Sequence, residues 1–138
     1  MAFPIRQFRF LMALSVCCWL AFLQTATAVS SPLTTTDAFG REVTFDKPPA
    51  RVVCLVPAVS EMLLALGAGK AVIGTTEHDV SLPWAEQKTL VGGFGAPEAE
   101  AIAALAPDLL MVASLHEEIK KHFRSGDPVL LQVETNSI

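Results

Sequence analysis

The sequence predicts an α/β protein with a Rossmann-like parallel sheet flanked by helices. Two apolar runs, residues 52–56 and 109–113, have the continuous hydrophobic character of strands that are buried on both faces, as in parallel sheets. Helical patterns lie between the strand candidates. Strands that alternate with helices at this spacing favour a parallel sheet over a hairpin-connected one.

The first 28 residues predict a secretory signal peptide that is not part of this fold. Two arginines give a positive start, residues 10–23 are almost wholly apolar, and an A-x-A sequence ends at Ala28. This apolar run is short for a membrane-spanning helix, which needs roughly 20 residues. An uncleaved anchor and lipoprotein processing at Cys17 are the alternatives. Cleavage after Ala28 would leave residues 29–138 as one small periplasmic domain.

The charge of the mature chain argues against nucleic acid as a partner. Without Arg6 and Arg9, eight basic and 14 acidic side chains remain, for a formal charge of −6. No basic patch for a phosphate backbone is therefore expected. Cys54 is the one cysteine after residue 28, and its place in an apolar strand predicts a buried free thiol. We expect a monomer without a resident cofactor.

The elements can be read in order along the chain. Residues 33–37 and 42–45 predict a hairpin, because a glycine-containing turn separates them. The strand at 51–56 leads into a helix with a clean apolar stripe; Ser60 and Glu61 stand at its front, and glycines 67 and 69 can end it. The other elements are a strand at 71–74, a polar loop at 75–88, a minor strand at 90–91, a flexible stretch at 92–95, a helix from Pro97 to Leu105, a strand at 109–113, a helix at 115–123 and a last strand at 129–133.

No motif carries the signature of an enzyme. The segment Gly67-Ala68-Gly69-Lys70 lacks the earlier glycine and the following Ser or Thr of a phosphate-binding loop. His116 and His122 are six residues apart, which puts them on different faces of a helix, so we expect surface histidines rather than zinc ligands. A small periplasmic α/β enzyme remains the alternative, although no nucleophile–base pair is evident.

The loops that follow the strands indicate where a ligand would bind. In open α/β sheets, ligands occupy the crevice at the carboxyl ends of the strands. The loop residues expected at that edge are Pro57 to Ser60, Glu77, His78, Asp79, Gly93, Phe94 and Ser114.

Several segments, in order, resemble the periplasmic binding proteins of the cobalamin and iron–siderophore uptake class. Thr36 to Arg41 resembles the opening hairpin of that family, and RVVCLVPAVSE resembles its first strand and Ser/Thr-Glu helix start. LGAGKAVIG is similar to the stretch that rejoins the sheet. VGGFGAPEAEAIAALAPDLLMVAS is similar to the block L-E-x-I-x-x-L-x-P-D-L-V. The resemblance covers about residues 34–138.

This resemblance implies a two-lobe protein with one long helix joining the lobes. Such proteins bind a metal chelate between the lobes and deliver it to the permease of an inner-membrane ABC importer. Residues 29–138 resemble the amino-terminal lobe, up to the start of the joining helix. We therefore expect a truncated or interrupted chain, with a nonfunctional fragment as the alternative. Cobalamin, a ferric siderophore and haem all remain open as the ligand.

The resemblance also implies ligand contacts. Phe94 falls where cobalamin-binding relatives carry an aromatic side chain that stacks on the ligand; the alternative is a place in the core of the lobe. His78 falls where relatives have a tyrosine near the pocket; the alternative is a solvated loop histidine. Pro57, Ala58 and Val59 would contact the ligand through backbone and shape. The chain has no tyrosine, which disfavours a haem binder that uses a tyrosine ligand.

Two glutamates match positions that contact the permease. Glu100 matches the docking glutamate of the first lobe, and the alternative is a solvated residue in the first turn of a helix, where the dipole stabilises it. Glu61 follows the Ser/Thr-Glu pattern, and a structural role at the helix start is its alternative.

Overall fold

The structure is a computed structural model that describes residues 32–81, 83–124 and 127–134. The predicted signal peptide, residues 1–28, lies outside the described residues, so its cleavage stays a prediction. Within the described ranges, no helix is long and apolar enough to cross a membrane.

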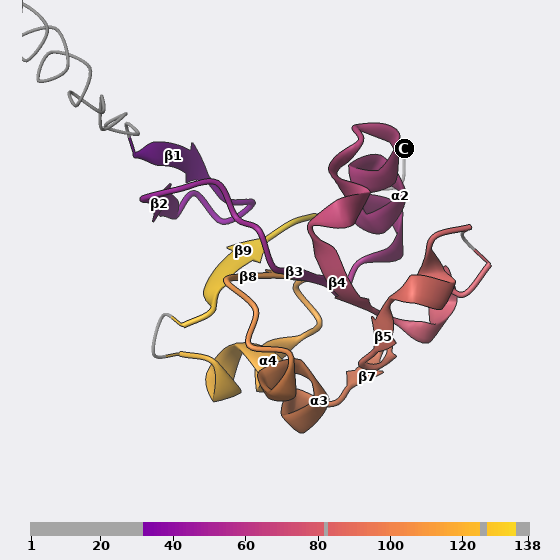
Figure 1. The fold of residues 1–138 in the computed structure, drawn as a ribbon. Coiled ribbons are helices and arrows are strands. Elements are labelled where there is room, and N and C mark those ends of the chain that lie inside the picture. The colour runs from indigo at the N-terminus through magenta and orange to yellow at the C-terminus, as the bar shows by residue number, and fades with distance from the viewer. Residues whose placement is uncertain (1–31, 82, 125–126, 135–138) are drawn as a thin grey trace, which may run out of the picture. The chain divides into compact units, whose positions relative to one another are not determined.

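A five-stranded parallel sheet forms the centre of the fold, with the strand order β5-β4-β3-β8-β9 (Figure 1). The chain starts in the middle at β3, moves outward through β4 to β5, and then crosses to β8 and β9 on the other side. The direction of winding therefore reverses between β3 and β8, which confirms the predicted Rossmann-like fold class. The strands are β3 (Val52–Cys54), β4 (Val72–Thr75), β5 (Thr89–Leu90), β8 (Leu109–Val112) and β9 (Val129–Gln132).

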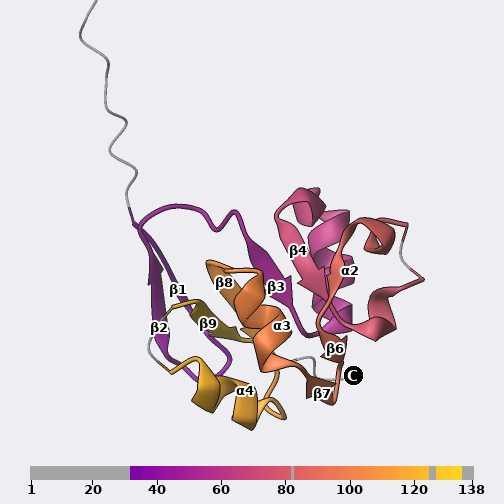
Figure 2. The same ribbon diagram turned by 60° about the horizontal axis from the view of Figure 1, so that its bottom comes forward.

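Helices cover both faces of the sheet. The helix α2 (Pro57–Ala65) packs on one face, and α3 (Ala99–Ala104) and α4 (Glu117–His122) pack on the other (Figure 2). Side chains alternate between the two faces along each strand, and helices cover both faces, so the strands are buried on both sides. In β3, Val52 and Cys54 lie in the core on the α2 side, whereas Val53 packs with Ile102 of α3 on the opposite side.

Cys54 is buried and unpaired, as its place in an apolar strand predicts. Burial raises the pKa of its thiol, because the thiolate would lose its solvation there. The thiol therefore stays neutral and behaves as a small apolar side chain.

The predicted amino-terminal hairpin is present as β1 (Leu33–Thr36) and β2 (Glu42–Phe45), an antiparallel pair. Asp37 begins its turn and accepts hydrogen bonds from the backbone N–H groups of Phe39 and Arg41, each at 2.9 Å. The Arg41 guanidinium contacts the same carboxylate at 2.6 Å. Burial alone would raise the pKa of Asp37, but these donors outweigh it and hold the pKa below its usual value.

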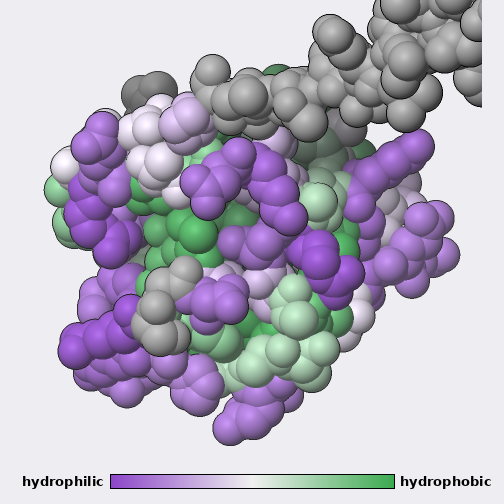
Figure 3. Space-filling model, turned by 60° about the vertical axis from the view of Figure 1, so that its left-hand side comes forward, coloured by the Kyte–Doolittle hydropathy of each residue, from purple (hydrophilic) through white to green (hydrophobic). Residues whose placement is uncertain are grey.

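The hairpin adds both core and surface to the fold. Its Val43 and Phe45 side chains join the core on the α2 side. Leu33 and Phe39 are 54% and 56% exposed. Figure 3 views the molecule from the hairpin side and shows apolar surface set among polar side chains.

Two local expectations were wrong. The helix α2 begins at Pro57 rather than near Ser60, because the fixed φ of proline suits a first helical position and the Val56 carbonyl already accepts the Ser60 N–H at 3.0 Å. Residues 92–95, expected to be flexible, start a two-stranded hairpin of β6 (Gly92–Gly93) and β7 (Ala96–Pro97). The predicted end of α2 is confirmed by Gly67, whose φ of 76° is left-handed. Three short 3₁₀ segments complete the fold: η1 (Ala68–Lys70), η2 (Glu77–Asp79) and η3 (Ala85–Gln87).

Asp108 ties the starts of two central strands together. Its carboxylate accepts the backbone N–H groups of Ala50 and Arg51 at 2.8 and 2.9 Å. Arg51 in turn donates through Nε to the Ala106 carbonyl at 3.0 Å. The Pro-Asp pair before β8 therefore belongs to the amino-terminal end of the sheet, away from the loops expected to bind ligand.

The fold predicts a large difference between two leucine truncations. Leu110 of β8 is fully buried on the α3 side, whereas Leu66 after α2 is 81% exposed. We expect Leu110→Ala to lower the free energy of unfolding by about 2–5 kcal/mol, because it loses apolar burial and leaves a cavity. Leu66→Ala should change it by no more than about 0.5 kcal/mol. Urea denaturation of both variants measures the difference, and similar values would contradict the core described here.

Candidate ligand-binding edge

The carboxyl ends of the strands bring together loops that are distant in sequence. The start of α2 follows β3, η2 follows β4, the β6–β7 hairpin follows β5, and residues 113–116 follow β8. Because β3 and β8 are neighbours at the point where the winding reverses, this edge has the geometry at which open α/β sheets bind ligands.

The β6–β7 hairpin presents Phe94 at its tip. Gly92 has a φ of +96°, and a Cβ there would lie 2.8 Å from the Ala96 carbonyl oxygen, so glycine is required for the turn. A Cβ at Gly93 would lie 2.8 Å from a carboxylate oxygen of Glu77, which shows how closely the hairpin approaches η2. Phe94 is half-buried, so it is not fully enclosed in the core of the lobe, and its contact with ligand stays a prediction.

Two histidines flank the Phe94 ring. The His78 ring lies 6.1 Å from it, centroid to centroid, at an interplanar angle of 75°. The His116 ring lies 5.4 Å from it at 84°. Both pairs are edge-to-face, a favourable arrangement for aromatic rings. The three rings join the loops after β4, β5 and β8 into one aromatic group at the edge.

His116 is buried, with 3% of its surface exposed, so the expectation of a surface histidine was wrong for this residue. Its Nδ1 accepts the Ala113 N–H at 3.0 Å, and its Nε2 lies 2.7 Å from the Phe94 carbonyl oxygen. An N–H can only donate and a carbonyl can only accept, so His116 is neutral and carries its proton on Nε2. Burial lowers the pKa of His116, and the positive charge of Lys120 lowers it further, although the Phe94 carbonyl opposes them. His122 is exposed, as expected.

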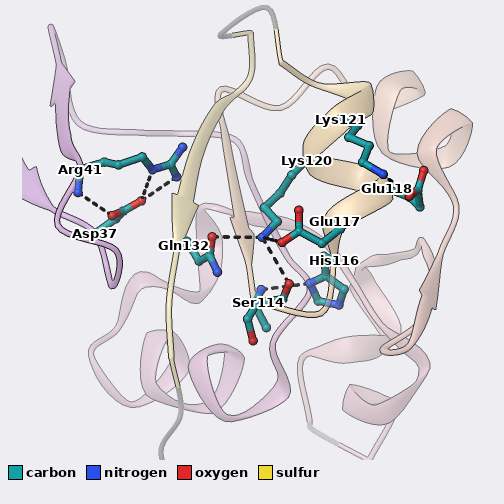
Figure 4. A network of polar contacts seen from close by, with 10 residues as sticks. Asp37, Arg41, Ser114, His116, Glu117, Glu118, Lys120, Lys121 and Gln132 are labelled. Atoms are coloured by element: carbon teal, nitrogen blue, oxygen red, sulfur yellow. Dashed lines mark hydrogen bonds and ion pairs between the residues drawn. The ribbon is translucent and has the colours of Figure 1, made fainter.

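Lys120 of α4 is held in place by three neighbouring residues (Figure 4). Its ammonium donates to Glu117 at 2.5 Å, to the Gln132 side-chain oxygen at 3.2 Å and to the Ser114 carbonyl at 3.3 Å. Three contacts use its three donors, so Lys120 braces the ends of β8 and β9 rather than offering a free charge to a ligand.

Asp79 anchors η2 through its buried side chain. It is 1% exposed, and its carboxylate accepts the Ser60 hydroxyl of α2 at 3.1 Å and the Thr75 hydroxyl at the end of β4. Ser60 and Thr75 are themselves fully buried. A buried carboxylate requires such donors. The two donors come from α2 and β4, so Asp79 links these two elements to η2 at the edge. Asp79 therefore positions the neighbouring His78 without facing a ligand itself.

The three predicted contacts at the start of α2 differ in their accessibility. Ala58 is exposed and Pro57 is half-buried, so both can present surface at the edge. Val59 is 8% exposed and packs in the core on the α2 side. Its side chain is therefore committed to the core, and a ligand contact of Val59 through its backbone stays a prediction. His78 is exposed and remains accessible.

The two predicted docking glutamates are both exposed but lie on different helices. Glu61 is on α2 and Glu100 is in the first turn of α3. These helices cover opposite faces of the sheet (Figures 1 and 2).

At the edge, the described side chains offer aromatic ring surface and the exposed imidazole of His78. In the described part of the chain, no three His, Cys, Asp or Glu side chains are placed to hold a metal ion. Two cavities lie elsewhere, beside the hairpin and β9. One of about 300 Å³ is lined partly by Arg41, Arg124 and Phe123, and one of about 170 Å³ by Phe45, Asp46 and Asp108. Both lie away from the aromatic group.

Sequence reasoning placed Phe94, His78 and Asp79 at this edge but missed His116. The local signal was weak: His116 stands directly before two glutamates, a usual place for a residue that begins a helix. Its contact with Phe94 spans 22 residues and could not be read from spacing.

Comparisons with known proteins agree with this geometry. The sequence profile described as "Periplasmic binding protein" matches residues 52–138. A "Cobalamin-binding protein" of Halobacterium salinarum is 39% identical over 87 residues, which is 61% of this chain and 23% of the relative. An "Uncharacterized ABC transporter substrate-binding lipoprotein YvrC" of Bacillus subtilis is 34% identical over 80 residues, 58% of this chain and 25% of the relative. The chain thus spans about a quarter of the length of these curated relatives.

Solved structures share the fold. The iron uptake ABC transporter substrate-binding protein PiuA of Streptococcus pneumoniae aligns with a TM-score of 0.67 and 22% identity, over 78% of this chain and 38% of that one. The heme binding protein HmuT aligns with a TM-score of 0.66 and 22% identity, over 83% and 38%.

Removal of the buried carboxylate should weaken the edge. We expect Asp79→Ala to lower the free energy of unfolding by about 1–3 kcal/mol, because the buried hydroxyls of Ser60 and Thr75 lose their acceptor. Glu86→Ala is the control, since Glu86 is exposed, and should change it by at most about 0.5 kcal/mol. Urea denaturation distinguishes the two, and equal effects would show that Asp79 does not anchor η2.

Proposed function

The chain belongs to the periplasmic binding protein family, and from this premise we propose that it supplies a substrate-binding lobe to an ABC importer of a metal chelate. Cobalamin is the first candidate, because the relative named for cobalamin binding is 39% identical to this chain over 87 residues. A ferric siderophore or haem is the next candidate, since solved proteins of this fold include ones named for iron uptake and heme binding.

The observation that carries this proposal is the aromatic group at the carboxyl edge. Phe94, flanked by His78 and His116, offers ring surface at the point where the sheet reverses its winding. A corrin or porphyrin is a large planar ligand with apolar faces, and such ligands are bound mainly by apolar and aromatic side chains with a few polar groups. The loop residues Pro57 and Ala58 would border the same ligand.

A binding role agrees better with this edge than the alternative of a small enzyme. Two buried polar groups there, His116 and Asp79, are occupied by contacts within the protein, whereas the buried Thr76 hydroxyl has no hydrogen-bond partner among the described residues. The His116 nitrogens contact only backbone groups and offer no base to a nucleophile. The proposed role therefore needs no catalytic group of this chain.

We also propose export to the periplasm with removal of residues 1–28. The basis is the charged start, the apolar run and the A-x-A sequence that ends at Ala28. Expression in a Gram-negative host should yield a periplasmic protein whose first residue is Val29, as measured by mass spectrometry of the amino-terminal peptide. Recovery of an intact Met1 terminus from the membrane would contradict cleavage and favour an uncleaved anchor.

The ligand is tested by absorbance titration of the full chain with cyanocobalamin, ferric haem and a ferric siderophore. We expect Phe94→Ala to weaken binding of the preferred chelate about tenfold or more, because a buried aromatic contact is lost. Phe39→Ala is the control, since Phe39 is an exposed phenylalanine in the turn of the β1–β2 hairpin and is not one of the expected ligand contacts, and should bind as the unaltered chain does. Equal loss in both variants, or binding of none of the three chelates, would contradict the proposal.

Permease docking is tested by charge reversal. We expect Glu100→Lys to reduce chelate uptake by whole cells about tenfold or more, since a like-charge contact with basic permease residues is costly, while leaving chelate affinity unchanged. Glu86→Lys makes the same charge change at another exposed glutamate and serves as the control. The same comparison applies to Glu61→Lys. Normal uptake by both glutamate variants would contradict docking through these carboxylates.

A further inference from the structure

His116 has a geometry that the proposed function does not by itself require. Its ring bridges two loops, accepting the Ala113 N–H after β8 and donating to the Phe94 carbonyl in the β6–β7 turn, at 3.0 and 2.7 Å. The same ring packs edge-to-face against the Phe94 side chain. One side chain thus holds both the backbone and the ring of the residue proposed to meet the ligand.

We infer that His116, in its neutral Nε2–H form, is a positioning residue that fixes Phe94 at the ligand edge. This inference rests on the proposed function, because it assigns to His116 the control of a ligand contact. His116 itself is 3% exposed and is not expected to touch ligand.

The turn that carries Phe94 needs such a support. Apart from the pairing of β6 with β7, it is held at its base, where Val91 donates its N–H to the Thr75 carbonyl and accepts the Glu98 N–H. Glycine at 92 and 93 leaves the strand β6 without side chains to pack. Glu77 lies against Gly93, and the described contacts of Phe94 at the tip come from His116 and from the His78 ring.

The arrangement depends on the protonation state of His116. A second proton would sit on Nδ1, where it would face the Ala113 N–H and replace an attraction by a repulsion. Of the titratable and charged groups around the ring, Lys120 of α4 is positive and paired with Glu117, and His78 of η2 lies across the Phe94 ring. Burial and the charge of Lys120 lower the pKa of His116, and the Phe94 carbonyl opposes them. The bridge is therefore complete above the usual histidine value of 6.5 and is lost as the pH falls through the lowered pKa of His116.

The positioning itself is tested without ligand, by NMR of the full chain with ¹³C-labelled phenylalanine rings. We expect His116→Leu to shift the Phe94 ring resonances toward exposed values, because the hydrogen bond and ring contact are lost. Phe45, which is in the core on the other face of the sheet, should keep its resonances and reports on folding. His116→Gln should restore much of the Phe94 signal, because its amide has both an acceptor and a donor. His122→Gln is the control for a histidine change on α4.

An acid titration of the unaltered chain gives a second readout that does not depend on a variant. The Phe94 resonances should move together with the His116 imidazole resonance, and the movement should persist in His78→Gln, which removes the other titrating neighbour. Unchanged Phe94 resonances in a folded His116→Leu protein would overturn the inference. If that variant also loses its Phe45 signals, the acid titration decides. Phe94 resonances that stay constant while the His116 imidazole resonance moves would then overturn the inference.

The link to function is measured separately with cyanocobalamin as the probe. His116→Leu should weaken binding about tenfold and His116→Gln less than about threefold, in proportion to the bridging bonds lost. If His116→Leu displaces Phe94 but binds cyanocobalamin with unaltered affinity, the positioned Phe94 ring does not contribute to ligand binding, and that part of the inference is overturned. Failure of the unaltered chain to bind would count against the proposed function, while the NMR results would still decide whether His116 positions Phe94.

Discussion

The buried carboxylate of Asp79 fixes the edge on which the proposed site is built. It joins a hydroxyl from α2, a hydroxyl from the end of β4 and the 3₁₀ segment that carries His78. A charged group with 1% exposure is tolerated only where donors surround it, so these elements have little freedom to separate. The position of η2 then limits the β6–β7 hairpin, because Glu77 lies against Gly93. The aromatic group follows from this arrangement.

The two ends of the sheet differ in the kind of contact that they hold. At the amino-terminal end, Asp108 and Arg51 tie β3 to β8 through backbone groups, and the Pro-Asp sequence before β8 is explained by that task. At the carboxyl end, the loops hold rings and polar groups whose packing leaves Phe94 half-buried and His78 exposed. This division is common in open α/β sheets, where binding groups gather at the carboxyl ends of the strands.

The fold could be predicted from sequence much further than the site could. Continuous apolar runs identified β3 and β8, and the hairpin and Gly67 were visible in local patterns, because these features depend on neighbours along the chain. The start of α2 was placed too late because the helical pattern was read from Ser60 and Glu61, although the Ser60 hydroxyl is used by Asp79 across the fold. The burial of His116 depends on contacts between elements, which spacing along the chain does not encode.

The central claim is that a metal chelate binds at the carboxyl edge, and amide hydrogen exchange of the full chain with and without cyanocobalamin tests it most directly. The account predicts slower exchange with ligand in residues 76–80 and 92–97, with little change in residues 41–46, which border the cavities beside the hairpin. Protection confined to residues 41–46, or protection at neither place despite measured binding, would contradict a ligand site at this edge.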